Sequence, residues 1–187
     1  PTTPDVVRIA AICNTARHLE VVAVMRERRL GSGGFDVVAG QPTVVELPVD
    51  AKVVGQGVAR VTLFSASREP LAERLVYHRR GADLRVELVA DKATYTPRDP
   101  VKLRVKTTDA RGQPVAASVA VAVVDETVLA FADDKSARIL ARMYLEPELG
   151  ATSAEPIEEP NFYFSDKPEA AAAMDALLAT RGYRRFE

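Results

Sequence analysis

Short β-rich segments recur along the first eighty residues, and their spacing is the feature that most restricts the fold of this chain. Turn-forming Asn, Gly, Pro and Ser residues separate them, and one such turn is expected at Gly31-Ser32-Gly33-Gly34. No helical pattern of ten residues fits in this half. Strands spaced at intervals of about ten residues are typical of an antiparallel sandwich rather than of βαβ units. We predict strands at residues 6–13, 18–28, 35–38, 43–48, 57–64 and 71–78.

The second half of the chain carries the clearest alternation of apolar and charged side chains. Residues 84–88 and 101–106 both follow this period of two, which predicts antiparallel strands with one buried and one solvent-facing side. A hairpin turn is expected at residues 109–114, and an almost continuously apolar run follows at residues 117–125. Such a run is typical of a central strand that is buried on both faces.

The pattern changes from strand to helix after residue 125. Helical spacing predicts a short helix around residues 139–143, followed by an acidic connection at residues 150–166. A second helix is expected after Ser165 or Asp166, with Gly182 ending it in the left-handed conformation. The aromatic tail at residues 183–186 is predicted to return to a strand.

A polar stretch at residues 79–83 separates the two halves, and we place a domain boundary there. The prediction is a mainly β chain of two tandem immunoglobulin- or fibronectin-like antiparallel β-sandwiches, at residues 1–81 and 82–187. The second sandwich is expected to carry a helical excursion over about residues 126–181. A length of 187 residues suits this division, because one such sandwich needs about 100 residues.

Composition argues against several classes of function. The chain has 25 basic and 26 acidic residues, so it offers no positive field for nucleic acid, and its apolar runs are too short for direct membrane insertion. Cys13 is the one cysteine, and His18 and His78 lie outside any ligand-spaced cluster, as expected of surface or strand-end histidines. With no nucleophile elbow or phosphate loop, we predict no catalytic residue, metal or cofactor and no enzymatic activity.

Three motifs in the second half resemble macroglobulin domains of bacterial α2-macroglobulin-like proteins. They lie at residues 93–101, which contain Tyr-Thr-Pro-Arg-Asp-Pro, at 109–115, which contain Asp-Ala-Arg-Gly-Gln-Pro, and at 118–129, which contain Val-Val-Asp-Glu-Thr. Residues 57–64 and 70–76 resemble the last strands of a preceding macroglobulin domain. Residues 158–164 and 174–186 resemble a segment common in bacterial members, whereas the thioester motif of the family is absent, because Cys13 lacks its Gly-Cys-Gly-Glu-Gln context.

The resemblance implies a fragment of a large periplasmic, cell-surface or secreted protein. Its partners would be neighbouring domains of the same parent chain, and the parent would act in protease inhibition or surface defence. In the family, a protease-sensitive bait segment follows the Val-Val-Asp motif. The corresponding residues 133–166 are short and contain helix here, so a structural excursion is preferred.

An alternative prediction makes the chain a protein-binding module, with a protease or another protein as the partner. The acidic connection at residues 150–166 would then be an interaction or bait-like loop, because a long loop inside a compact domain tends to be functional or disordered. Its candidate contact residues are Glu155, Glu158, Glu159, Phe162, Tyr163 and Phe164.

Overall fold

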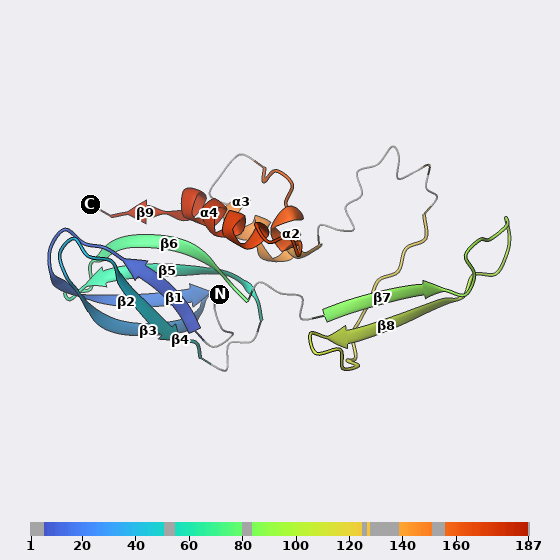
Figure 1. The fold of residues 1–187 in the computed structure, drawn as a ribbon, viewed down its shortest axis with the longest axis horizontal. Helices are drawn as coiled ribbons and strands as arrows, with labels where there is room; N and C mark the ends of the chain where they lie inside the picture. The colour runs from blue at the N-terminus through green and yellow to red at the C-terminus, as the bar shows by residue number, and fades with distance from the viewer. Residues whose placement is uncertain are drawn as a thin grey trace. The chain divides into compact units, whose positions relative to one another are not determined.

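The computed structural model describes residues 6–50, 55–79, 84–124, 127, 139–150 and 156–186 (Figure 1). The chain divides into two compact units, and each is described by itself. The first unit combines Pro1–Arg80 with Lys135–Glu187, and the second comprises Gly81–Asp134. None of the helices in the described ranges is long and apolar enough to cross a membrane.

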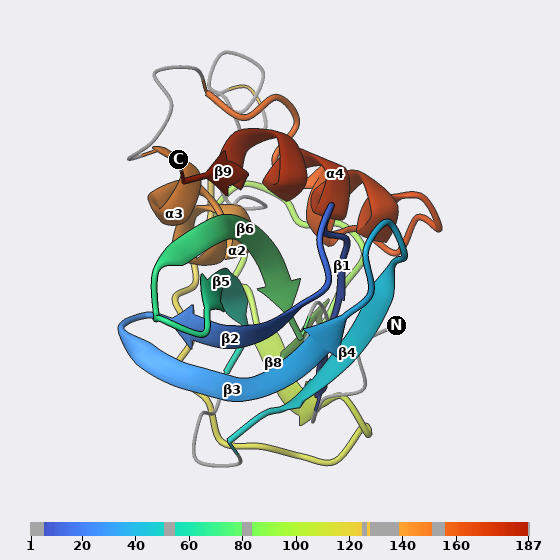
Figure 2. The ribbon, with the colours of Figure 1, turned by 90° about the vertical axis from the view of Figure 1, so that its left-hand side faces the viewer.

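The first unit contains two antiparallel sheets in a sandwich-like arrangement (Figures 1 and 2). β1 (Val6–Ala11) pairs with β4 (Thr43–Pro48). The larger sheet has the order β3-β2-β5-β6-β9, formed by Arg28–Val37, Arg17–Met25, Gly57–Ser65, Pro70–His78 and Arg184–Arg185. Its inner face and the smaller sheet enclose a core of Val7, Val21, Ala23, Met25, Leu30, Leu47, Ala59 and Val61.

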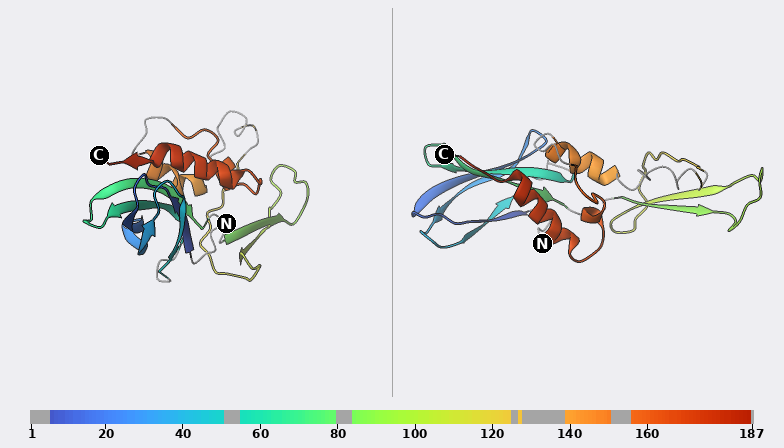
Figure 3. Two further views of the ribbon diagram at one scale, coloured as in Figure 1. Left: turned by 60° about the vertical axis from the view of Figure 1, so that its left-hand side comes forward. Right: turned by 90° about the horizontal axis from the view of Figure 1, so that it is seen from above.

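Helices cover the other face of the larger sheet. They are α2 (Ile139–Tyr144), α3 (Glu146–Gly150), the 3₁₀ helix η2 (Phe162–Phe164) and α4 (Ala170–Gly182), and α4 lies over β6 (Figures 2 and 3). Successive strand residues point to opposite faces, so Val58 faces the helices while Ala59 faces the sandwich core. The second cluster consists of Val58, Leu75, Leu145, Leu149, Met174 and Leu178.

The helical segment packs on the first unit, which differs from the sequence-based division that placed it with residues 82–187. Its apolar stripe, Met174 and Leu178, meets Leu75 of β6 and forms the second cluster with it. The predicted helices are confirmed as α2 and α4, although α4 begins at Ala170, and the predicted strand in the tail is confirmed as β9.

The turn between β2 and β3 lies where no turn was predicted. It consists of Arg26 and Glu27, whose φ angles of 48° and 62° fit the two-residue hairpin turn that needs positive φ at both positions. The prediction of a turn at residues 31–34 was wrong, because these glycines lie inside β3. A Cβ on Gly31 would lie 2.5 Å from the carbonyl oxygen of Pro48, so close strand packing requires glycine there.

The second unit contains one antiparallel hairpin, β7 (Leu84–Ala90) with β8 (Leu103–Asp109). The predicted central strand at residues 117–125 was wrong for its described part, because residues 115–124 form no strand and Val123 is 80% exposed. A strand buried on both faces needs neighbours, and the described residues of this unit supply a single two-stranded sheet. The mainly β, antiparallel character is thus confirmed, while a second sandwich is left as a prediction.

Candidate functional site

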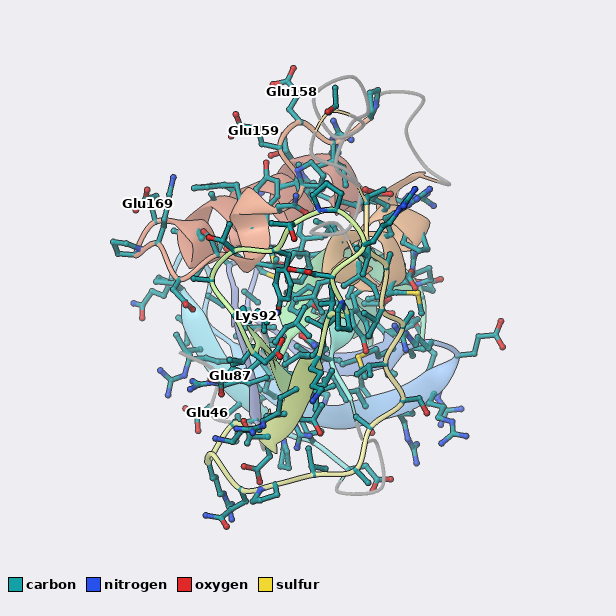
Figure 4. The ribbon with its side chains drawn as sticks, turned by 90° about the vertical axis from the view of Figure 1, so that its right-hand side faces the viewer. Glu46, Glu87, Lys92, Glu158, Glu159 and Glu169 are labelled. Carbon is teal, nitrogen blue, oxygen red and sulfur yellow. The ribbon has the colours of Figure 1, made fainter. Side chains whose placement is uncertain are left out.

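The predicted loop residues divide into exposed acids and packed aromatics. Glu155 lies outside the described residues, whereas Glu158 and Glu159 are exposed and point away from the ribbon (Figure 4). Tyr163 and Phe164 pack against the second cluster, and the Phe164 ring meets the Tyr77 ring edge-on, with centroids 5.6 Å apart. Phe162 contacts Tyr163 in the same edge-on manner. The aromatic residues therefore anchor this segment to the sheet. The Phe162 amide donates a hydrogen bond to the Glu159 carbonyl at 2.9 Å, but the carboxylate side chains of the two acids point away from the ribbon.

A groove that the sequence did not predict lies between β1 and β6. It encloses about 450 Å³, and we call it the β1–β6 groove. Its walls are residues 7–10 of β1, Val44 of β4, residues 74 and 76–78 of β6, and residues 171, 174 and 175 of α4. A smaller cavity of about 100 Å³ shares Ile9, Ala10, Arg74 and Val76 with it, so the hollow continues along the same two strands.

Two polar side chains in the groove have hydrogen-bonding atoms without partners. His78 is 1% exposed, and neither its Nδ1 nor its Nε2 has a partner among the described residues. Arg74 donates a hydrogen bond from Nη2 to Asp175 Oδ2 at 2.5 Å. Its Nε is buried and has no hydrogen-bond partner among the residues that the structure describes. Of the two predicted alternatives, a surface or a strand-end histidine, the second is confirmed, because His78 ends β6, but its side chain is buried. Its place on the same face as Val76 is the signal that could have revealed burial.

Burial lowers the pKa of His78, and the nearby positive charge of Arg79 lowers it further. The imidazole is therefore neutral at pH 7, with one nitrogen that donates and one that accepts a hydrogen bond. Unpartnered buried polar groups are uncommon in folded proteins, so these atoms are candidates for contact with a bound molecule. The groove thus combines apolar walls with one neutral donor–acceptor pair and one spare N–H.

The lowered pKa predicts that the fold loses stability in acid through His78. In the unfolded chain His78 binds a proton near pH 6.5, whereas in the folded chain it does so only at lower pH. The contribution of neutral His78 to the free energy of unfolding is therefore fully present above about pH 6.5 and is lost as the pH falls below it. We expect the free energy of unfolding to fall between pH 7 and 5 more steeply in the wild type than in His78→Leu. The pH slopes of the two proteins can differ by up to about 1.4 kcal/mol per pH unit, the value for one proton. Urea denaturation at several pH values measures it, and identical slopes would contradict the prediction.

The described residues contain no group of three or more His, Cys, Asp or Glu side chains that could hold a metal ion. Comparison with known proteins adds no family: no family model matches the chain, and no curated protein matches it.

Proposed function

We propose that the chain is a non-catalytic structural and interaction module of a large α2-macroglobulin-like protein, in which it packs against neighbouring domains. The observation that carries the proposal is the uncovered apolar face of the β7–β8 hairpin. The register pairs Leu88 with Val105 and Ala90 with Leu103 on this face. Val86 and Leu88 are 55% and 54% exposed. Contiguous exposed apolar residues of this kind mark interaction surfaces.

The opposite face of the hairpin is charged, which makes the ribbon two-sided. Arg85, Glu87, Arg104 and Lys106 alternate with the apolar residues, and Lys106 Nζ lies 3.8 Å from Glu87 Oε2. A two-stranded hairpin is at best marginally stable alone in water, so it needs a covering layer. A polar outer face and an apolar inner face are what one layer of a sandwich presents to its partner.

Two of the three motifs that resemble the macroglobulin family build the two ends of the hairpin. Tyr95 donates a hydrogen bond to Asp91 at 2.5 Å, and Asp99 accepts one from the amide of Thr96 at 3.0 Å. At the other end Asp109 Oδ1 accepts from the amides of Arg111 and Gln113, at 2.8 and 2.9 Å. These conspicuous residues form turns, which supports a structural rather than a chemical role.

In the longer protein, we propose that this packing serves protease inhibition or surface defence in the periplasm, at the cell surface or in the secreted state. The family-like motifs support this part of the proposal. The acidic connection gives no comparable support for a separate binding function, because the described aromatics near its end pack inward.

The proposal predicts that the apolar face of β7 is protected in the longer protein. We expect amides of residues 84–90 to exchange with solvent at least about tenfold more slowly there than in the isolated chain, a ratio worth about 1.4 kcal/mol. Val86→Thr with Leu88→Thr should abolish this protection, because the side chains that would be buried become polar. Hydrogen–deuterium exchange followed by mass spectrometry measures both effects.

The matched control places the same residue on the charged face. Arg85→Thr with Glu87→Thr should retain the protection, because those side chains lie on the opposite side of the ribbon. Equal exchange in the isolated chain and the longer protein would refute the proposal.

A further inference from the structure

We propose that the β1–β6 groove binds one extended, apolar peptide segment of a partner protein, which adds to the first unit as a strand. The inference goes beyond the proposed function, because it concerns a different unit and does not depend on the β7–β8 hairpin. Strand addition to open sheet edges is a common mode of peptide recognition.

Both sides of the groove are strand edges that lack a neighbour among the described strands. Among the described strands, β1 pairs with β4 alone, and β6 pairs with β9 only at Ala72 and Glu73, so no described strand lies beside Arg74 and Val76 on the outer side of β6. Successive side chains of a strand point to opposite faces. The groove is nevertheless lined by consecutive residues, 7–10 on one side and 76–78 on the other. The strands therefore face the groove with their edges, where the main chain offers N–H and C=O groups.

The unpartnered polar atoms match a peptide main chain better than other ligands. Neutral His78 requires one donor and one acceptor, and Arg74 Nε requires an acceptor. An extended main chain presents N–H and C=O groups alternately, so it can satisfy all three atoms. A purely apolar molecule would leave them buried and unpaired. An anion is disfavoured, because Arg8 is paired with Glu46 and Arg74 with Asp175.

The walls select apolar side chains of moderate size. Val7, Ile9, Val76 and Met174 line the groove. Its volume of about 450 Å³ lies within the range of about 300–1,000 Å³ common for ligand pockets. The charged residues at its rim already have partners of opposite charge, so a neutral segment fits best. The proposed ligand is therefore a neutral β-strand of alternating Val, Thr or Ala without central proline.

A synthetic peptide tests the proposal directly. The probe is Lys-Lys-Val-Thr-Val-Ala-Val-Thr-Val-Lys-Lys, titrated into the full ¹⁵N-labelled chain and followed by NMR. We expect shifts of the amides of residues 7–10 and 74–78 and of the His78 ring, which is easily assigned because the chain has two histidines. A control peptide with proline in place of both Thr and the central Ala should bind at least about tenfold more weakly, because proline removes the ladder N–H.

Two variants locate the site on the protein. Ala171→Trp places a large ring at a groove-lining position of α4, and Ala172→Trp places it at the next exposed position, which does not line the groove. We expect the first to weaken binding at least about tenfold and the second to leave it within about twofold, a difference of about 1 kcal/mol or more. Unchanged thermal melting of both variants would establish that the fold is intact.

Three outcomes would overturn the inference. The first is equal binding of the proline peptide, and the second is equal effects of the two tryptophan variants. The third is that octanoate, a small apolar anion, or a second copy of the chain at high concentration reproduces the same shifts without the peptide. None of these outcomes would contradict the proposed role of the β7–β8 hairpin, which is tested by hydrogen–deuterium exchange.

Discussion

Gly182→Ala is expected to destabilise the first unit by about 2–3 kcal/mol, although alanine is the better helix former. A Cβ at this position would lie 2.3 Å from Cγ, 2.4 Å from Cδ1 and 2.8 Å from Cβ of Leu75. Leu75 belongs to the second cluster and is itself buried, so it cannot move aside without displacing Met174 and Leu178. The helix thus approaches β6 at a distance that only glycine permits.

Close approach to Leu75, and not the predicted left-handed conformation, therefore explains the glycine at position 182. Gly182 is absent from the residues with positive φ, and Tyr183 leaves the helix in an extended conformation. The prediction was wrong because a glycine at a helix end has two physical uses, positive φ and close approach, and the local sequence does not distinguish them. The distinction depends on Leu75, which is over a hundred residues away in the chain.

A double-mutant cycle with Leu75→Ala separates the two explanations. If close approach is the cause, Gly182→Ala should cost much less in the Leu75→Ala background, with a coupling of about 1 kcal/mol or more. A conformational penalty alone would be the same in both backgrounds. Gly33→Ala is the matched control, because a Cβ there would meet its nearest neighbour at an ordinary 3.4 Å. Urea denaturation followed by circular dichroism suits a chain without tryptophan, and additive effects would refute the argument.

Much of the first unit was predictable because its signals are local. Strand spacing and alternation gave β1, β4, β5 and β6 within a few residues of their observed bounds, and helical spacing gave α4. The exception in β2 and β3 is instructive. Arg26 makes the hairpin turn in place of the expected glycines and also donates a hydrogen bond to the carbonyl of Met143 at 3.2 Å. The Arg26 guanidinium also lies over the Tyr144 ring, which links the turn to α2. A tertiary contact of this kind cannot be predicted from the local sequence.

The candidate sites were less predictable, because they depend on residues distant in sequence. Glu158 and Phe164 were predicted to belong to one contact loop because they are close in the sequence. The structure separates their roles, because the Phe164 ring packs against Tyr77 of β6, a residue that is distant in the sequence. The β1–β6 groove joins β1, β6 and α4, and each of these segments alone reads as an ordinary amphipathic element. His78 is a strand-end histidine as predicted, but its burial depends on residues that are distant in the sequence.

A second large effect is expected at the ion pair between Arg60 and Glu73 on the helix-covered face. Glu73 is only 8% exposed, its Oε1 accepts a hydrogen bond from Arg60 Nη1, and its Oε2 accepts one from Thr62 Oγ1 at 3.2 Å. Arg60→Met removes the positive partner while the carboxylate stays buried. Breaking such a pair from one side costs about 3–5 kcal/mol, and we expect the lower end because Arg60 is partly exposed.

The double variant Arg60→Met, Glu73→Leu shows whether the cost arises from the orphaned carboxylate. Apolar replacement of both partners removes the buried charge, so this variant should recover most of the stability lost in Arg60→Met. Arg8→Met is the matched control, because it breaks the exposed pair with Glu46 and should cost less than about 1 kcal/mol. Urea denaturation of all three variants gives the comparison. If the double variant is as unstable as Arg60→Met, the unpaired Glu73 carboxylate is not the cause of the lost stability. The loss would then come from the packing of the Arg60 stem over the sheet.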